Sequence, residues 1–264
     1  MVLARVSGYR ALRILIVLGL LSLGSVLFWL AFPNVLVRFG AYPLAFVALL
    51  PVAVAIRRMR WWATPLYGAF YGFVAYALFN YWLATFHPLA IFIVPLIYAG
   101  YFFVFFPLLW VADHLFGRWA FLAQTLVWLT YEWVRTQGFL GYSYGIMGYS
   151  LFPAPLLIQA ADLGGVWIIS FFVVLPAFFL GQIINEHRLG TLFSWGRLRA
   201  VLRWRMGEII GYGVLTLFVV LYGVFSPVDY SAAPRWRVAL VQQNVDPWVG
   251  GFRAYERSLD ILIR

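Results

Sequence analysis

A succession of long apolar runs, broken by short segments that carry arginine, constrains this chain more than any other feature. Each run is close to the ~20 residues that a helix needs to cross the hydrocarbon core of a bilayer. In that core every backbone polar group must be bonded within the protein, so apolar runs of this length become helices. The sequence therefore predicts an all-α polytopic membrane bundle with about seven spans. The predicted spans cover residues 14–32, 35–56, 65–86, 89–112, 119–136, a stretch within 156–184, and 207–225.

Composition agrees with a membrane protein and excludes several kinds of site. The 264 residues are 64% hydrophobic and 11% charged, whereas a soluble domain carries about 25% charged residues. The sequence has no cysteine, which excludes disulfides, thiolate metal ligands and a thiol nucleophile within it. His87, His114 and His187 fall in separate predicted loops. We therefore expect no metal site and no cofactor.

The arginines predict how the bundle is oriented. All 19 basic residues are arginine and the net charge is +10, but the arginines flank apolar runs, which argues against nucleic-acid binding. With the N-terminus in the cytoplasm, the inner segments carry 12 arginines and the outer loops carry only Arg38 and Arg135. Arginine-rich loops stay in the cytoplasm, so residues after 226 are predicted to be extracytoplasmic. Residues 194–205 alternate apolar residues with arginine, as expected for an interfacial helix on an anionic leaflet.

Residues 227–264 differ from the predicted bundle. An apolar run at 238–241 is followed by the polar residues 242–244 and an Asp-Pro turn, which is the pattern of a buried strand in a parallel sheet. Such a strand needs neighbours on both edges. We therefore predict two domains. Residues 1–226 form a seven-span domain, and residues 227–264 form a linker, a first strand and the start of a helix of an incomplete extracytoplasmic α/β domain.

Two charged residues at helical spacing lie in or beside a predicted span. Glu132 and Arg135 are three residues apart, so they can pair on one helix face. Ionisable groups in a membrane are functional candidates by default, and a structural ion pair is the alternative. If they pair, reversing both charges should restore part of what a single change removes.

Residues 141–150, rich in glycine and tyrosine, are predicted to form a re-entrant or interfacial loop. Gly68 and Gly72 permit close helix contact.

These residues resemble the apolipoprotein N-acyltransferase family. That family has Glu-x-x-Arg, then Gly-Phe-Pro-Trp-x-x-x-Gly-Tyr-Ser and a proline, and it inserts a nitrilase-like domain between its seventh and eighth membrane helices. The first strand of that domain is similar to residues 241–244 here, with Gln243 in place of glycine. Tyr142, Ser143 and Tyr144 stand where the family has Phe-Pro-Trp. The matching motif residues are Glu132, Arg135, Gly141, Gly148, Tyr149, Ser150 and Pro155.

The resemblance implies a multi-pass acyltransferase of the bacterial inner (cytoplasmic) membrane. The family transfers an acyl chain from a phospholipid to the N-terminal diacylglyceryl-cysteine of lipoproteins, through a thioacyl-enzyme that uses Glu, Lys and Cys. This chain has neither Cys nor Lys. We therefore expect the catalytic triad to lie beyond Arg264 and the chain alone to be inactive. By resemblance, the candidates for substrate or lipid contact are Asn80, Trp82, Tyr142, Tyr144, Tyr149 and Trp248.

Two other functional classes are compatible with a bundle of this kind. A small transporter or channel subunit would use Glu132 and Arg135 as pathway residues and Tyr142, Tyr144 and Tyr149 as a gate. A non-catalytic scaffold would dock the soluble domain of another protein. A transporter has no need of a strand after its last span, so the run at 238–241 favours the acyltransferase.

Overall fold

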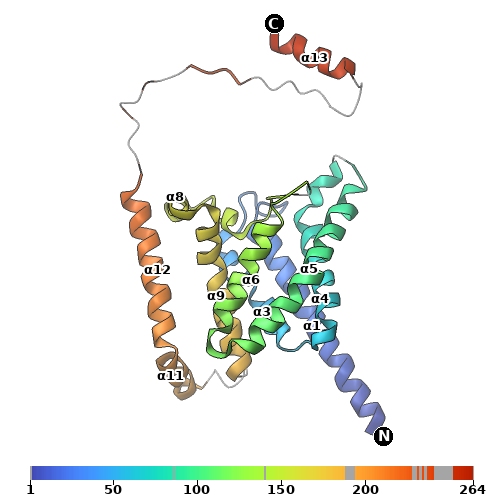
Figure 1. Ribbon diagram of the computed structural model, residues 1–264, viewed down its shortest axis with the longest axis vertical. Helices are drawn as coiled ribbons and strands as arrows, with labels where there is room; N and C mark the ends of the chain where they lie inside the picture. Colours follow the sequence, from blue (N-terminus) through green and yellow to red (C-terminus); the bar gives the residue numbers. More distant parts are fainter. Residues whose placement is uncertain are drawn as a thin grey trace. The chain divides into compact units, whose positions relative to one another are not determined.

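The computed structural model describes residues 2–85, 87–139, 141–187, 194–227, 231, 234, 237–240 and 252–263. The chain divides into two units, Met1–Pro227 and Val228–Arg264. The first unit is a helical bundle (Figure 1). All the sites described below belong to this first unit.

The bundle combines long helices with short ones. Within the described residues, four helices are long and apolar enough to cross a membrane. They are α1 (Val2–Ala31), α5 (Ala90–Leu115), α9 (Val166–His187) and α12 (Met206–Phe225). The shorter helices are α2 (Ala45–Ala48), α3 (Leu50–Ile56), α4 (Thr64–Phe79), α6 (Ala120–Val134), α7 (Pro155–Ile158), α8 (Ala161–Gly164) and α11 (Trp195–Trp204). Short 3₁₀ segments connect them at η1 (Tyr42–Leu44), η2 (Trp61–Ala63), η3 (Tyr81–Thr85), η4 (Gly117–Trp119) and η5 (Met147–Leu151).

The prediction of seven spans is met in part. α4 and α6 have 16 and 15 residues, which is about 24 and 22 Å at ~1.5 Å per residue, against a hydrocarbon core of about 30 Å. The 3₁₀ segments η2 and η3 flank α4, and η4 precedes α6, so each helical segment comes close to its predicted range. Both predicted positions are therefore helical, but neither helix alone is long enough for a full crossing.

The predicted span at 35–56 differs most from the structure. Residues 33–41 are turns and irregular backbone, and the helical part that follows is divided at Leu49 into α2 and α3. Pro51 lies at the start of α3 and has no N–H to bond the carbonyl one turn earlier, so the helical ladder is interrupted there. Residues 51–56 are buried, which makes α3 part of the core of the bundle.

Two glycines let α4 and α5 approach closely, as their spacing predicts. A methyl group on Gly68 would overlap the backbone carbonyl of Phe102, and one on Gly72 would lie 2.6 Å from the carbonyl oxygen of Tyr98. A side chain at either position would force the helices apart. The two helices run side by side in the bundle (Figure 1).

Aromatic side chains fill the space between α4, α5 and α6. The rings of Tyr76 and Tyr98 stack with their centroids 3.4 Å apart. Phe102 packs against Tyr131 and Trp128, with centroid distances of 4.4 and 5.6 Å. All five side chains are at most 2% exposed. This packing fixes the end of α6, from which the loop at 141–150 leaves.

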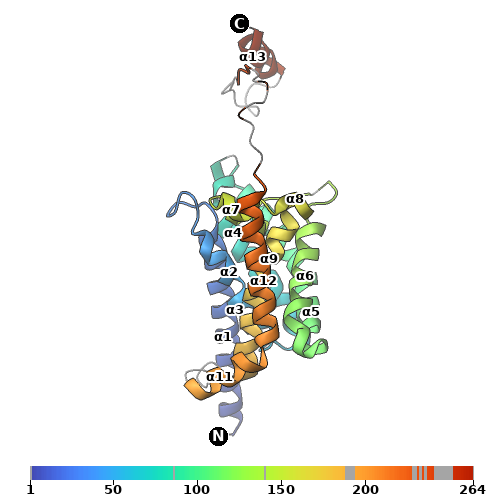
Figure 2. The ribbon, with the colours of Figure 1, turned by 90° about the vertical axis from the view of Figure 1, so that its left-hand side faces the viewer.

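α12 runs along the side of the bundle and leaves most of its surface exposed (Figure 2). The hydroxyl of Tyr212 donates a hydrogen bond of 3.1 Å to the carbonyl oxygen of Phe172 in α9. Near its other end, Gly223 lies so close to Leu156 of α7 that a methyl group there would overlap a carbonyl. α11, just before α12, confirms the helix predicted within 194–205.

The second unit contains the helix α13 (Phe252–Ile263). Residues 237–240 are neither helix nor strand, so the part of the predicted strand that the structure describes is not a strand. The polar cluster at 242–244 and Trp248 lie outside the described residues.

Candidate functional site

The loop at 141–150 folds back onto the bundle because two of its glycines allow it. Gly145 has a φ of +79°, a backbone conformation that glycine adopts without strain. Gly148 packs against α9, where a methyl group would lie 2.7 Å from the carbonyl oxygen of Val166. Its N–H donates a 2.9 Å hydrogen bond to Ser170 Oγ. The motif glycine at 148 therefore has a packing reason that is visible in the structure.

Glu132 holds the second half of this loop from inside the bundle. Its side chain, on α6, is completely buried. Glu132 Oε1 accepts a 2.8 Å hydrogen bond from the backbone N–H of Met147 and a 3.1 Å bond from Trp128 Nε1. A hydrogen bond to a charged acceptor in a buried place is stronger than one between neutral groups. The carboxylate therefore fixes the point where the loop enters η5.

Arg135 holds the first half of the loop. Its side chain is also completely buried. Arg135 Nη1 donates to the carbonyl oxygens of Tyr144 at 2.7 Å and Tyr142 at 3.2 Å, and to the hydroxyl of Tyr98 at 2.8 Å. Cation–π contacts surround the guanidinium as well. Its Cζ lies 5.4 to 5.6 Å from the ring centroids of Tyr76, Tyr98 and Tyr131.

The predicted ion pair between Glu132 and Arg135 is not formed directly. No nitrogen of Arg135 lies within 4.0 Å of a carboxylate oxygen of Glu132, although the structure describes both side chains. The reason is that each side chain bonds a different part of the loop, near Met147 in one case and near Tyr142 and Tyr144 in the other. The two charges are two separate attachments of one loop.

A cavity of about 830 Å³ is bounded by this loop and by the segments that follow α1 and α4. Its walls are mostly apolar and aromatic. Its volume is within the ~300–1,000 Å³ of typical small-molecule sites, which are likewise lined mainly by apolar and aromatic groups. The lining residues are Phe32, Pro33, Asn34, Val35, Leu36, Arg38, Phe79, Tyr81, Trp82, Ser143, Tyr144, Gly145, Tyr149 and Phe152.

Five of the six residues proposed for lipid contact are found at or beside this cavity. Trp82, Tyr144 and Tyr149 line it, and the rings of Trp82 and Tyr144 have centroids 5.8 Å apart. Tyr142 and Asn80 do not line it, but each is next in sequence to a lining residue, and the Tyr142 hydroxyl donates a 2.8 Å hydrogen bond to Asn80 Oδ1. Two segments that are far apart in the sequence thus meet at one site.

The segment at 32–38 was not predicted as part of the site, because most of it falls within the predicted spans 14–32 and 35–56. In the structure Asn34 Oδ1 accepts hydrogen bonds from the N–H groups of Leu36 and Val37, at 2.8 and 2.9 Å. This turn directs the chain along the cavity. The available signal was the pair Pro33-Asn34, since both residues favour turns over helix.

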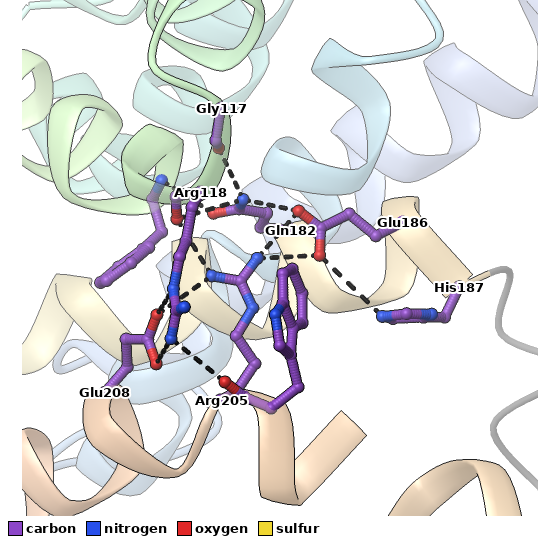
Figure 3. Close-up of polar contacts among 9 residues, drawn as sticks. Gly117, Arg118, Gln182, Glu186, His187, Arg205 and Glu208 are labelled. Carbon is purple, nitrogen blue, oxygen red and sulfur yellow. Dashed lines mark hydrogen bonds and ion pairs between the residues drawn. The ribbon is translucent and has the colours of Figure 1, made fainter. Parts of the chain in front are cut away.

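A second polar cluster, in which Arg205 and Gln182 are buried, joins η4, the end of α9 and the start of α12 (Figure 3). Arg205 Nη2 donates to both carboxylate oxygens of Glu186, at 2.8 Å each. Arg118 Nη2 donates to Glu208 Oε2 at 2.9 Å, and hydrogen bonding to that carboxylate raises the pKa of Arg118 above its ordinary value. Gln182 Nε2 donates to Glu186 Oε1 at 2.7 Å. We call these five residues the Arg205 cluster.

Two further arginines, Arg58 and Arg13, make hydrogen bonds at the same end of the bundle as the Arg205 cluster. Arg58 Nη1 donates a 2.8 Å hydrogen bond to Asn185 Oδ1, one residue before Glu186 in α9. Arg13, in the first half of α1, donates to the carbonyl oxygen of Arg58. The segments that line the cavity follow the other ends of α1 and α4. The sequence pattern at 194–205 predicts an interfacial helix and gives no indication of this cluster. The acidic residues that flank it were the signal for the cluster.

Comparison with known proteins identifies relatives over most of the chain. The sequence model of the apolipoprotein N-acyltransferase N-terminal domain matches residues 3–179. Apolipoprotein N-acyltransferase 1 of Treponema denticola is 38% identical over 244 residues, covering 91% of this chain and 43% of that protein. Apolipoprotein N-acyltransferase 1 of Treponema pallidum is 35% identical over 252 residues, covering 92% of this chain and 45% of that protein. The chain therefore spans less than half the length of these curated relatives.

Proposed function

This chain belongs to the apolipoprotein N-acyltransferase family, and we propose that it forms the membrane part of an enzyme that transfers a phospholipid acyl chain to lipoproteins. The acceptor would be the N-terminal diacylglyceryl-cysteine of a lipoprotein, and no cofactor is needed. Because the sequence contains neither cysteine nor lysine, we expect no acyl transfer from these 264 residues alone. Their contribution would be to bind the lipid and to present it for the chemistry.

We further propose that the bundle crosses the bacterial inner membrane seven times with its N-terminus in the cytoplasm. The four long helices would cross completely, while α3, α4 and α6 would complete their crossings through the adjoining 3₁₀ segments and loops. The orientation is supported by the arginines, because Arg13, Arg58 and the Arg205 cluster gather at one end. A cytoplasmic position of that end agrees with the tendency of arginine-rich loops to stay inside.

The single observation that carries the proposal is the cavity of about 830 Å³. Apolar walls such as Phe32, Leu36 and Phe79 suit an acyl chain, since burying apolar surface is favourable by about 25 cal/mol per Å². The loop that forms one wall is held by hydrogen bonds to the buried side chains of Glu132 and Arg135. We infer that the cavity receives an acyl chain of the donor phospholipid, and that the buried charges keep its wall in shape.

A phospholipid with a photoactivatable diazirine in one acyl chain would test this proposal. After illumination of the chain in nanodiscs, we expect mass spectrometry to locate cross-links on cavity residues such as Leu36 and Phe152. Unlabelled phospholipid should compete with them. Substituting Ser143→Trp should fill the cavity and lower the capture.

The chain offers a matched control for this experiment. A second space of about 420 Å³ lies among α6, α9 and α12 and is lined by Leu122, Leu175 and Leu215 among others. Leu122→Trp fills that space instead, and should leave capture at the cavity unchanged. Cross-links spread evenly over all exposed helices, with no response to Ser143→Trp, would show that the cavity has no special role.

The geometry does not favour a transport pathway through Glu132 and Arg135. Both side chains are completely buried and bonded to the loop and its neighbours. Neither is among the residues that line the cavity. A pathway residue would have to face a space that an ion or solute can enter.

A further inference from the structure

One charged side chain lies in the otherwise uncharged wall of the cavity. Among the described residues that line it, Arg38 alone carries a charge. Arg38 is exposed, and its guanidinium carbon lies 5.4 Å from the ring centroid of Phe39. In the part of the chain that the structure describes, no carboxylate lies within ion-pair distance of Arg38. The cavity therefore combines apolar walls with one cation that the protein itself does not neutralise.

Three arginines at the other end of the bundle are neutralised by carboxylates of the protein. Arg57 pairs with Asp113 at 3.5 Å, and Arg118 and Arg205 pair with carboxylates of the Arg205 cluster. Other arginines at that end, such as Arg13 and Arg60, have no carboxylate within ion-pair distance in the described part of the chain, but neither of them lines this cavity. The exposed position of Arg38 on the cavity wall is instead available to an anion that comes with an apolar tail.

We propose that Arg38 binds the phosphodiester group of the phospholipid whose acyl chain occupies the cavity. The inference rests on the proposed function and adds the residue that recognises the donor lipid and the group it recognises. A guanidinium suits phosphate because its planar N–H groups match two phosphate oxygens at once. The remaining wall is apolar or neutral, so the anionic group would be held at Arg38 and the acyl chain along Phe32, Leu36 and Phe152. A glycerophospholipid carries both parts on one glycerol backbone.

Because the sequence has no cysteine, a fluorophore can be attached to a single introduced cysteine. A single cysteine introduced as Val35→Cys, on the cavity wall, can carry an environment-sensitive fluorophore that reports on filling of the cavity. Three probes would be titrated into the chain in detergent: phosphatidylglycerol, diacylglycerol with the same acyl chains, and inorganic phosphate. The first has both the tail and the phosphodiester, and each of the others lacks one part.

We expect Arg38→Gln to weaken phosphatidylglycerol binding about fivefold, because one arginine near an anionic lipid contributes ~1 kcal/mol. Diacylglycerol binding should not change, and Arg38→Lys should keep part of the affinity. Arg60→Gln is the matched control, since Arg60 is also exposed and lies 6.0 Å from the ring centroid of Trp62, away from the cavity. It should have no effect on either lipid.

Equal losses for phosphatidylglycerol and diacylglycerol on Arg38→Gln would overturn the assignment, because Arg38 would then only shape the cavity. Unchanged binding of both lipids would overturn it as well. Inorganic phosphate that binds as tightly as phosphatidylglycerol would identify a simple anion site and contradict lipid recognition. If neither lipid changes the fluorophore in the Val35→Cys protein itself, the proposed acyl site fails, and the assignment of Arg38 fails with it. That result is distinct from the first two.

Discussion

Arg135 and Arg205 are both completely buried, yet these two arginines, at opposite ends of the bundle, have different kinds of partner. Arg205 has carboxylate partners, with Glu186 at 2.8 Å and Glu208 at 3.3 Å. Arg135 has carbonyl oxygens, a hydroxyl and aromatic faces, and its Nε and Nη2 have no hydrogen-bond partner in the described part of the chain. A carboxylate neutralises the buried charge and joins two helices. Carbonyl oxygens only orient it, so the charge instead determines the path of a loop.

The difference teaches that burial alone does not define the role of a charged side chain. Removing one partner from a buried ion pair leaves an uncompensated charge, which is costly. Removing a donor from a loop leaves carbonyl groups unbonded, which costs less and acts locally. We therefore expect changes at the Arg205 cluster to affect the stability of the whole bundle, and changes at Arg135 to affect mainly the wall of the cavity.

The largest effect is expected from Glu186→Gln. It removes the carboxylate that accepts two hydrogen bonds of 2.8 Å from the fully buried Arg205 guanidinium and leaves only the longer pair with Glu208, so it should cost about 3 kcal/mol of unfolding free energy. Thermal unfolding in detergent measures it. Arg203→Gln is the control, because Arg203 is exposed in α11, two residues before Arg205, and surface changes stay within about 0.5 kcal/mol. Equal effects of the two substitutions would mean that the cluster does not join the helices.

Arg135→Gln and Glu132→Gln should each cost about 2 kcal/mol, since each leaves buried partners with weaker or missing bonds. Hydrogen exchange should rise in the loop at 141–150 and stay low in α4 and α5. Because the two side chains hold different atoms, the double charge reversal should not restore protection. Recovery in the double variant would instead support a direct ion pair.

Gly148→Ala should destabilise the chain by about 1 to 2 kcal/mol, since its methyl group would lie 2.7 Å from the carbonyl oxygen of Val166. Gly100→Ala, in α5, provides the comparison, because nothing lies within 4 Å of a methyl group there. That change should be neutral or stabilise the helix by up to about 1 kcal/mol. Unfolding midpoints measured under one condition would compare them. Tolerance of alanine at 148 would show that the loop can move off α9.

The smallest effect is expected for Tyr142→Phe, which removes the 2.8 Å hydrogen bond to Asn80 and should cost about 1 kcal/mol. Capture of the photoactivatable lipid should fall slightly with it. Tyr149→Phe is matched to it, because the Tyr149 hydroxyl makes no hydrogen bond to any described residue. Identical lipid capture by the two variants would mean that Tyr142 does not support the cavity wall.

Apolar length and glycine spacing made the main parts of the fold predictable. Gly68 and Gly72 predicted a close helix pair, and the structure confirms it. The broken segment at 42–56 could not be read from hydropathy, because an apolar sequence is equally suited to a lipid-facing helix and to a buried, interrupted one. Pro51 was the available warning, since it interrupts the helical ladder there.

Aromatic residues that line the cavity were among the candidates named from the sequence, whereas the turn at 33–37 was not. Tyr144, Tyr149 and Trp82 were named from motif positions, and all three line the cavity. Arg38 was read only as a topology signal, since nothing in its local sequence shows which distant segments it meets. Spacing suggested that Glu132 and Arg135 bond each other, but spacing on a helix cannot show that a later loop offers both of them better partners.

The attachment of α12 has a mechanical consequence. Its 20 residues span about 30 Å, the thickness of a hydrocarbon core. It is pinned near its start by Glu208 and near its end by the contact of Gly223 with Leu156, and most of the surface between is exposed. A free helix answers a change in bilayer thickness by tilting. A helix pinned at both ends behaves as a strut, so a thinner or thicker membrane would load the Arg118–Glu208 bonds and the α7 contact directly.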